Sequence, residues 1–258
     1  MKKPVFRALF SALTLSFAAG STHAVSINES NSATVLANTL AGQGITISNA
    51  VLSTASDSAA GTFTQGGNIG FDAGVLLTTG TTGCAVGPNT SGDCSGTGAS
   101  TSLKFDFTSS TGAVSFKYVF ASEEYLDFVG TEYNDLFELK LNGVNIALLP
   151  GDNGVVSINN VHPGLNSAFF RYNDGSIDTQ YNGLTTVLTA SASNLKGVNT
   201  FEFLIQDRGD DYYDSGVFIE AGTFSSQPGP VPEPRSVAML SAGLMGIYAA
   251  TRKRKQAR

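Results

Sequence analysis

Apolar and polar residues alternate in most of the short segments between turn residues, and this period of two predicts β-strands. The clearest segment is residues 114–120, VSFKYVF, in which every second side chain is large and apolar. Residues 103–107 and 199–205 repeat the pattern with Leu, Ile and Phe. Further strand-like segments are residues 45–52, 74–79, 136–141, 144–149, 155–160, 184–190 and 216–224. Because Gly-rich turns separate these roughly ten short strands, the predicted fold class is all-β, a jelly-roll-like β-sandwich.

One segment has helical spacing instead. Residues 32–40, SATVLANTL, carry apolar side chains three and four positions apart, with Asn31 or Ser32 as a possible N-cap and Gly42 as a stop. We expect this to be the one short helix of the folded body. A polar stretch over residues 161–183 is expected to be a loop, and loops of this length are more often functional than accidental.

The N-terminus has the three parts of a secretory signal peptide. Lys2, Lys3 and Arg7 precede an apolar run over residues 8–19, and small residues follow up to Ala24. We therefore predict a cleavable Sec-type signal over residues 1–24, removed by signal peptidase, and an exported body over residues 25–224.

The C-terminus carries Val231-Pro232-Glu233-Pro234 after a linker at residues 225–231, and then an apolar run over residues 237–250. At about 1.5 Å per residue this run spans roughly 21 Å, so residues 234–251 and some bilayer thinning are needed to approach a hydrocarbon core of roughly 30 Å. Because the run is apolar on all sides, we predict a transmembrane helix rather than a basic amphipathic tail. The basic residues that should stay cytoplasmic are Arg252, Lys253, Arg254, Lys255 and Arg258.

Charge is unevenly distributed along the chain. Residues 25–230 hold six basic and twenty acidic residues, a formal net charge of −14. This excess of negative charge excludes a nucleic-acid-binding role and favours divalent cations. The two cysteines, Cys84 and Cys94, lie in one Gly-rich segment, and in an exported protein we expect them to form a disulfide.

Two acidic stretches, residues 121–141 and 204–222, interrupt the strand pattern. Each follows a predicted strand and precedes another, so the two stretches can lie side by side at one end of the sandwich. Carboxylate oxygens are the ligands that Ca²⁺ prefers, and four aspartates within eight residues repel one another unless a cation lies among them. The alternative is a solvated acidic rim with turn-capping aspartates. The predicted calcium ligands are Glu123, Glu124, Asp135, Asp207, Asp210, Asp211 and Asp214.

The exported body has few residues suited to catalysis. Its single histidine, His162, lies in a polar loop beside Pro163, so a Ser-His-Asp or Cys-His site is disfavoured, and zinc lacks ligands. Paired carboxylates are also the chemistry of glycoside hydrolases, whose sites usually carry aromatic platforms. The body has no Trp, and its candidate platform residues are Tyr125, Tyr133, Tyr212 and Tyr213. We therefore expect a protein that is not an enzyme.

The C-terminal unit resembles a PEP-CTERM sorting signal, because Pro232-Glu233-Pro234, the apolar span and the basic end occur together over residues 232–258. The resemblance implies recognition of Pro232, Glu233 and Pro234 by exosortase. It also implies a transient inner-membrane anchor in a Gram-negative bacterium that makes an exopolysaccharide matrix.

The body resembles the choice-of-anchor L domain over nearly all of residues 25–224. The matching segments are residues 74–80 (GVLLTTG), 120–125 (FASEEY), 134–137 (NDLF), 141–143 (LNG), 205–211 (IQDRGDD) and 214–218 (DSGVF). One departure is Asn182-Gly183, where Asp-Gly is expected, so no site is carried over to this position. The family is named for occurring with different C-terminal anchors, and the resemblance implies location and architecture rather than a ligand.

Taken together, these features predict an exported, exosortase-processed surface or extracellular-matrix protein. Its expected role is structural or adhesive, stabilised by calcium, with exopolysaccharide or other surface proteins as partners. The alternative is a carbohydrate-binding module, and a carboxylate-dependent glycoside hydrolase ranks below both.

Overall fold

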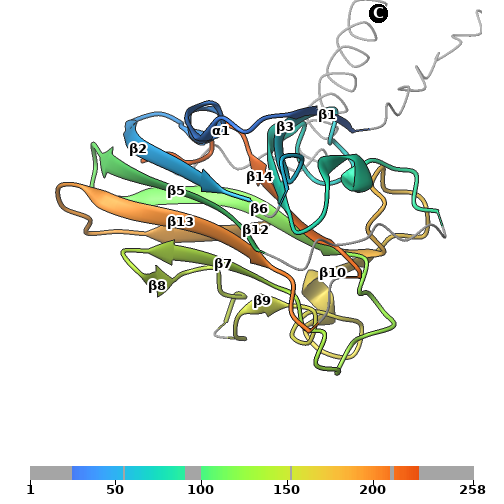
Figure 1. The fold of residues 1–258 in the computed structure, drawn as a ribbon. Helices are drawn as coiled ribbons and strands as arrows, with labels where there is room; N and C mark the ends of the chain where they lie inside the picture. The colour runs from blue at the N-terminus through green and yellow to red at the C-terminus, as the bar shows by residue number, and fades with distance from the viewer. Residues whose placement is uncertain (1–24, 55, 91–99, 152, 210–211, 227–258) are drawn as a thin grey trace, which may run out of the picture.

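The computed structural model describes residues 25–54, 56–90, 100–151, 153–209 and 212–226. Within these residues the chain forms two antiparallel sheets that pack face to face, which confirms the predicted all-β sandwich (Figure 1). The larger sheet runs in the order β1 (Ser26–Glu29), β3 (Ala60–Thr64), β4 (Ala73–Thr78), β14 (Ser215–Glu220), β6 (Val114–Ser122), β11 (Gly183–Thr185) and β10 (Phe170–Tyr172), with β12 (Leu188–Ala192) also paired to β6. The smaller sheet runs β2 (Ile45–Ser53), β5 (Ser100–Ser109), β13 (Asn199–Gln206), β7 (Leu136–Leu141) and β8 (Val144–Asn145), with β9 (Val156–Ser157) paired to β7.

The core between the sheets is built from the alternating aromatic positions. In the register of β5 and β13, Phe105 faces Phe201 and Leu103 faces Phe203, so both strands direct the same set of side chains inward. Phe116 on β6 meets these rings from the larger sheet, with its ring centroid 5.4 Å from that of Phe203. The period-two pattern therefore identifies the inward faces correctly.

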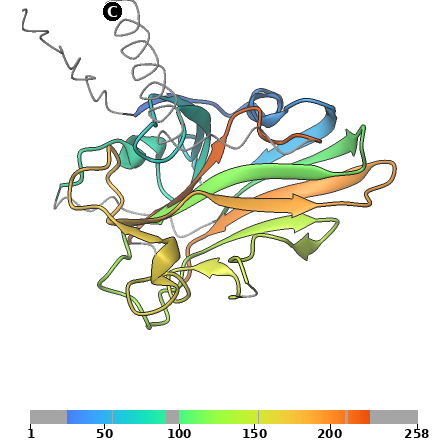
Figure 2. The ribbon, with the colours of Figure 1, turned by 180° about the vertical axis from the view of Figure 1, so that it is seen from behind.

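The larger sheet is buried on its other face as well. A second apolar cluster packs there, with Phe63, Leu76, Val119 and Phe218 from the sheet and Phe71 and Tyr181 among its other members. Seen from behind, the loops at residues 65–72, 79–90 and 173–182 lie together at one end of the molecule (Figure 2). Burial on two faces explains the continuous apolar runs of β4, of β14 and of the second half of β6.

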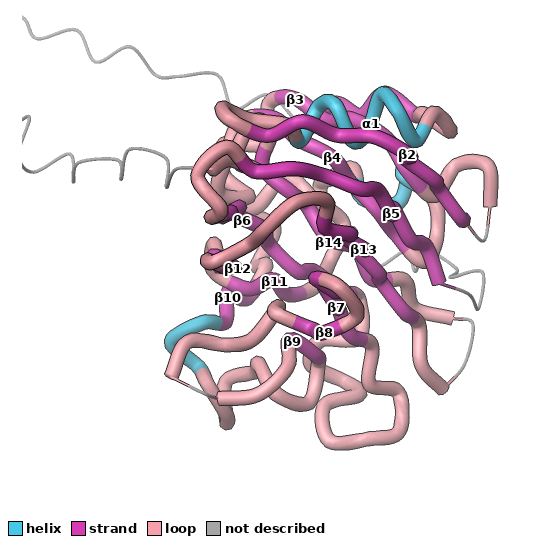
Figure 3. Tube along the Cα trace, turned by 90° about the vertical axis from the view of Figure 1, so that its left-hand side faces the viewer, coloured by secondary structure: helices cyan, strands magenta, loops and turns pink. Residues whose placement is uncertain are grey.

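The predicted helix is confirmed as α1 (Ala33–Leu40), which lies beside β2 and β3 (Figure 3). The Ser32 hydroxyl accepts a hydrogen bond from the Val35 amide at 3.4 Å and so acts as the N-cap. Leu36 and Leu40 are buried. The helix ends at Leu40, before Gly42, whose missing side chain lets the Gly222 carbonyl approach closely.

Residues 161–183, predicted to be a polar loop, contain regular secondary structure. They include a short 3₁₀ turn, η2 (Ser167–Phe169), as well as strand β10; a further turn, η1 (Thr82–Ala85), lies elsewhere in the chain. Asn173 is buried and organises the following turn, because its amide donates to the carbonyls of Ile177, Thr179 and Tyr181 at 2.8–3.2 Å. This turn positions Tyr181 at the acidic end described below.

Several predicted features fall outside the described residues. These are the signal peptide at residues 1–24, Cys94, Asp210, Asp211, and the sorting segment with Pro232, Glu233 and Pro234. Over the portion of the chain that is described, no helix has the length and hydropathy to cross a membrane. The predicted disulfide also stays a prediction, because one of its two cysteines is not described.

Candidate functional site

The acidic stretches meet at one end of the sandwich, called here the acidic end: residues 123–135, between β6 and β7, and residues 207–209 and 212–214, between β13 and β14 (Figure 1). Strand pairing causes this. Ser215 at the start of β14 lies opposite Ser122 at the end of β6, and Gln206 at the end of β13 lies opposite Leu136 at the start of β7. Antiparallel pairing thus places both connections at the same end of the sandwich, where these strands begin or end.

Asp135 joins the two sheets at this end. Its side chain is fully buried, at 0% exposure. One carboxylate oxygen, Oδ1, accepts a hydrogen bond from the Arg208 amide at 2.8 Å, and the other, Oδ2, accepts one from the Ser215 hydroxyl at 2.7 Å. Arg208 follows the smaller sheet's β13 and Ser215 begins the larger sheet's β14, so a single carboxylate holds both in place.

Asp214 is equally buried and has an incomplete set of partners. Its Oδ2 accepts hydrogen bonds from the Thr78 hydroxyl at 3.0 Å and from the Tyr181 hydroxyl at 3.4 Å. Its Oδ1 is buried and has no hydrogen-bond partner among the described residues. Burial raises the pKa of Asp214 to about 7; the Thr78 and Tyr181 hydrogen bonds oppose the rise, and the negative charge of Asp135 adds to it.

Glu123 and Glu124 extend the cluster from the end of β6, at 4% and 1% exposure. The Glu123 amide donates to the Asp214 carbonyl at 3.1 Å, and the Glu124 amide donates to the Ser122 hydroxyl at 2.9 Å. The Glu123 carbonyl accepts from the Asn182 side-chain amide at 2.8 Å. Backbone hydrogen bonds therefore hold both glutamates beside the two aspartates.

Tyr125 lies beneath this cluster in the core. Its ring contacts Phe170, with centroids 5.0 Å apart, and its hydroxyl is buried with no hydrogen-bond partner in the described part of the chain. Burial, and secondarily the charge of Asp135, raise the pKa of Tyr125. Tyr125 is therefore a neutral core residue and not part of an exposed aromatic platform.

Two glycines allow the close packing around Asp214. A Cβ atom on Gly80 would lie 2.7 Å from Asp214 Oδ2, and one on Gly216 would lie 2.5 Å from the Tyr181 hydroxyl. These contacts give a physical reason for the glycines of GVLLTTG and DSGVF. The residue types alone did not identify Thr78 and Tyr181 as partners of Asp214. Thr78 lies two residues before Gly80 in the sequence, whereas Tyr181 comes close to Gly216 only in the folded chain.

The structure brings together part of the predicted calcium set. Glu123, Glu124, Asp135 and Asp214 are buried at one end, and Asp207 is half-buried at the start of the connection that ends at Asp214. Among the described residues, however, no group of three or more His, Cys, Asp or Glu side chains is arranged to hold a metal ion. Asp210 and Asp211 are not described, so the calcium site stays a prediction.

Two buried oxygens at the acidic end are of the type that hard cations take as ligands. Asp214 Oδ1 and the Tyr125 hydroxyl have no hydrogen-bond partner among the described residues, and burial together with the negative charge of Asp135 raises the pKa of both residues. Ca²⁺ takes six to eight such oxygen ligands, whereas zinc prefers nitrogen and sulfur.

Three aromatic rings form a cluster at the outer side of the acidic end. Phe128 and Tyr133 have ring centroids 5.3 Å apart, and Phe128 and Tyr213 have centroids 5.1 Å apart. All three are half-buried, and neighbouring Tyr212 is 69% exposed. Of the four tyrosines predicted as platform residues, Tyr133 and Tyr213 therefore meet at one surface, together with Phe128, which the prediction omitted.

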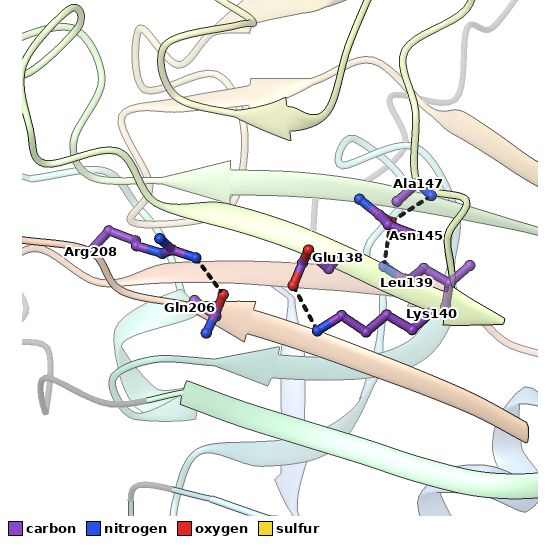
Figure 4. A network of polar contacts seen from close by, with 7 residues as sticks. All are labelled: Glu138, Leu139, Lys140, Asn145, Ala147, Gln206 and Arg208. Carbon is purple, nitrogen blue, oxygen red and sulfur yellow. Dashed lines mark hydrogen bonds and ion pairs between the residues drawn. The ribbon is translucent and has the colours of Figure 1, made fainter. Parts of the chain in front are cut away.

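The outer face of the smaller sheet carries a different kind of polar contact (Figure 4). There, Lys140 and Glu138 form an ion pair at 2.9 Å on the surface of β7. Arg208 donates from Nη2 to Gln206 Oε1 at 3.1 Å. The Asn145 side chain accepts from the Leu139 and Ala147 amides, both at 3.0 Å, which fastens the edge strand β8 to β7.

Comparison with known proteins gives one family. The family model described as Choice-of-anchor L domain matches residues 24–225. No curated protein and no solved structure matches the chain.

Proposed function

The chain belongs to the choice-of-anchor L domain family, and from this membership we propose that it is a surface or extracellular-matrix protein with a structural and adhesive role, stabilised by calcium at its acidic end. The family indicates an exported or surface-anchored protein, built around an anchor-type domain. The structural role, the calcium and the matrix association are our proposals.

One observation carries the calcium proposal: Asp214 Oδ1 is buried without a hydrogen-bond partner in the described residues, next to the buried Asp135. A buried carboxylate is costly unless a hydrogen bond, a proton or a cation compensates for the lost water. Glu123 and Glu124 add two more carboxylates at the same end. A divalent cation coordinated there would hold the ends of both sheets together.

The ion needs more ligands than Asp135 and Asp214 supply. Both oxygens of Asp135 already accept hydrogen bonds, so each would use a second lone pair for the ion. By sequence, Asp207, Asp210 and Asp211 belong to the same connection and complete the set we propose.

The proposed cell biology rests on the two ends of the sequence. We propose export through the signal peptide, transient anchoring in the inner membrane, and processing by exosortase at Pro232-Glu233-Pro234. The processed protein would then belong to the cell surface or to an exopolysaccharide-rich matrix. A rigid sandwich of net charge −14 suits such a role, because it stays soluble and resists association with anionic surfaces.

A carbohydrate-binding module is the second candidate function. The Phe128, Tyr133 and Tyr213 cluster favours it, because half-buried rings on hydrogen-bonded loops can stack against sugars. A hydrolase is less well supported, because the paired carboxylates Glu123 and Glu124 are only 4% and 1% exposed.

Thermal unfolding of the full-length protein in EDTA, in millimolar Ca²⁺ and in millimolar Mg²⁺ tests the calcium proposal. A ligand that binds only the folded state adds about 2.7 kcal/mol at a hundred times its Kd, which raises the Tm by several degrees. We expect a rise that is selective for Ca²⁺, reduced in Asp207→Asn and Asp214→Asn, and unchanged in Glu138→Gln, a surface control. An equal Tm in EDTA and Ca²⁺ would overturn the proposal.

A further inference from the structure

The aromatic cluster at the acidic end, Phe128, Tyr133 and Tyr213, unites two connections of the fold. Phe128 and Tyr133 come from the connection between β6 and β7, and Tyr213 comes from the connection between β13 and β14. The Phe128 ring lies nearly perpendicular to the Tyr133 ring, at 88°, and at 40° to the Tyr213 ring. All three side chains are partly exposed, so ring surface is available to a ligand.

Hydrogen bonds hold these rings in position before any ligand arrives. The Phe128 carbonyl accepts from both the amide and the hydroxyl of Thr131, at 3.1 Å and 2.7 Å. The Thr131 carbonyl accepts from the Asn159 side chain at 2.9 Å. Gly209 packs directly against the Tyr133 ring, since a Cβ atom there would lie 2.6 Å from Cδ1. A preorganised surface loses little conformational entropy on binding.

The charged residues around the cluster favour a cationic ligand over an anionic one. Asp127 and Glu132 adjoin Phe128 and Tyr133 in the sequence, and both are exposed. The one basic residue of the two described connections, Arg208, directs its guanidinium to Gln206 (Figure 4). The body as a whole has a net charge of −14. An anionic polymer is therefore repelled, whereas a cationic group gains from both the carboxylates and the ring faces.

We propose that the aromatic cluster binds amine-bearing sugar units of a polysaccharide. The rings contact the apolar faces of the sugar and attract its ammonium group, and Asp127 and Glu132 accept hydrogen bonds from ammonium and hydroxyl groups. This inference rests on the proposed matrix role and specifies the class of polysaccharide. A sugar is favoured over a basic peptide because the partly exposed rings, at differing tilts, offer apolar surface to a sugar face beside the negative charges of Asp127 and Glu132.

Isothermal titration of the full-length protein tests the proposal with three probes: a glucosamine hexamer, an N-acetylglucosamine hexamer and an oligolysine of equal charge. We expect the glucosamine hexamer to bind most tightly and to weaken as salt rises. Tyr133→Ala and Tyr213→Ala should each weaken it about fivefold or more, and Asp127→Asn with Glu132→Gln about threefold. Tyr172→Ala, at a tyrosine 58% exposed on β10, is the matched control and should bind unchanged.

Each other outcome overturns the proposal. Equal binding of the N-acetylated hexamer would show that the amine is not recognised, and equal binding of oligolysine would show that charge alone suffices. Absence of binding would refute the site. The Asp127→Asn and Glu132→Gln changes lie on exposed side chains, so the test holds even if a tyrosine variant fails to fold. The calcium-dependent Tm is an independent measurement, so the proposed function can stand when the glycan site fails.

Discussion

The acidic end and the outer face of the smaller sheet both carry carboxylate side chains, but in opposite environments. On the outer face, Glu202 on β13 lies opposite Lys104 on β5 and Lys140 on β7, and Glu138 pairs with Lys140. These charges stay near water, where an ion pair contributes 1 kcal/mol or less. At the acidic end, Asp135 and Asp214 are fully buried, and the partners described for them are hydroxyl and amide groups.

The difference shows where an added cation has the largest effect. Surface carboxylates are already paired with lysines or solvated by water, so binding a cation adds little to stability. A buried carboxylate gains a great deal from a proton or a metal, because the surrounding protein screens its charge poorly. Asp214, a buried carboxylate whose pKa is raised, therefore marks the acidic end as the place to look for function.

The largest expected effect is the pH dependence that Asp214 confers in EDTA. Its folded-state pKa of about 7 lies above that of an unfolded aspartate, so its contribution to stability is complete below about pH 4 and is lost as pH rises to about 7. The loss is on the order of 4 kcal/mol at most. Asp214→Asn should abolish this slope when the free energy of unfolding is measured by urea denaturation from pH 4 to 8.

Asp106→Asn is the control for this measurement. Asp106 is a partly exposed residue whose pKa is lowered by hydrogen bonds from Asn49 and Thr200, so its substitution leaves the slope between pH 5 and 7 unchanged. Bound Ca²⁺ would favour the ionised form of Asp214 and flatten the wild-type slope. A slope that persists in Asp214→Asn would assign the titration to Asp135, Glu123 or Glu124 instead.

Removal of the link between the sheets should have the next largest effect. Asp135→Ala leaves the part-buried Arg208 amide and the buried Ser215 hydroxyl without their acceptor, at a cost of about 3 kcal/mol. Urea denaturation at pH 6 measures the loss. Asp135→Asn retains one acceptor oxygen and should lose less. A loss below about 1 kcal/mol in Asp135→Ala would contradict the inter-sheet role.

The smallest effect is expected on the outer face. Glu138→Gln breaks the pair with Lys140, whose side chains are 25% and 29% exposed, and should lower the free energy of unfolding by about 0.5 kcal/mol or less. The same denaturation assay, repeated at low and high salt, measures it. A loss as large as that of Asp135→Ala would remove the contrast between the two regions.

Much of the fold was predictable because its signals are local. The Phe alternation of residues 199–205 became β13, and the cap and spacing near Ser32 became α1. Residues 161–183 were less predictable, because Asn173 organises their turn through carbonyls four to eight residues away and Phe170 packs on Tyr125. At the candidate site, sequence reasoning named Asp135 and Asp214 but placed Tyr125 on the surface, although the structure buries it in the core.

By itself, the sequence determined the strand and helix segments, the negative charge of the exported body and its family motifs, because each of these is written in residues close together along the chain. Only the tertiary structure decided which carboxylates are buried. Asp214 contacts Thr78 from 136 residues away, once β4 and β14 have paired, and Tyr181 from 33 residues away, through the connection between β10 and β11. Burial of a polar group depends on such distant neighbours. The same acidic stretch therefore contains both the buried Asp214 and the exposed Arg208, which lies beside Gly209.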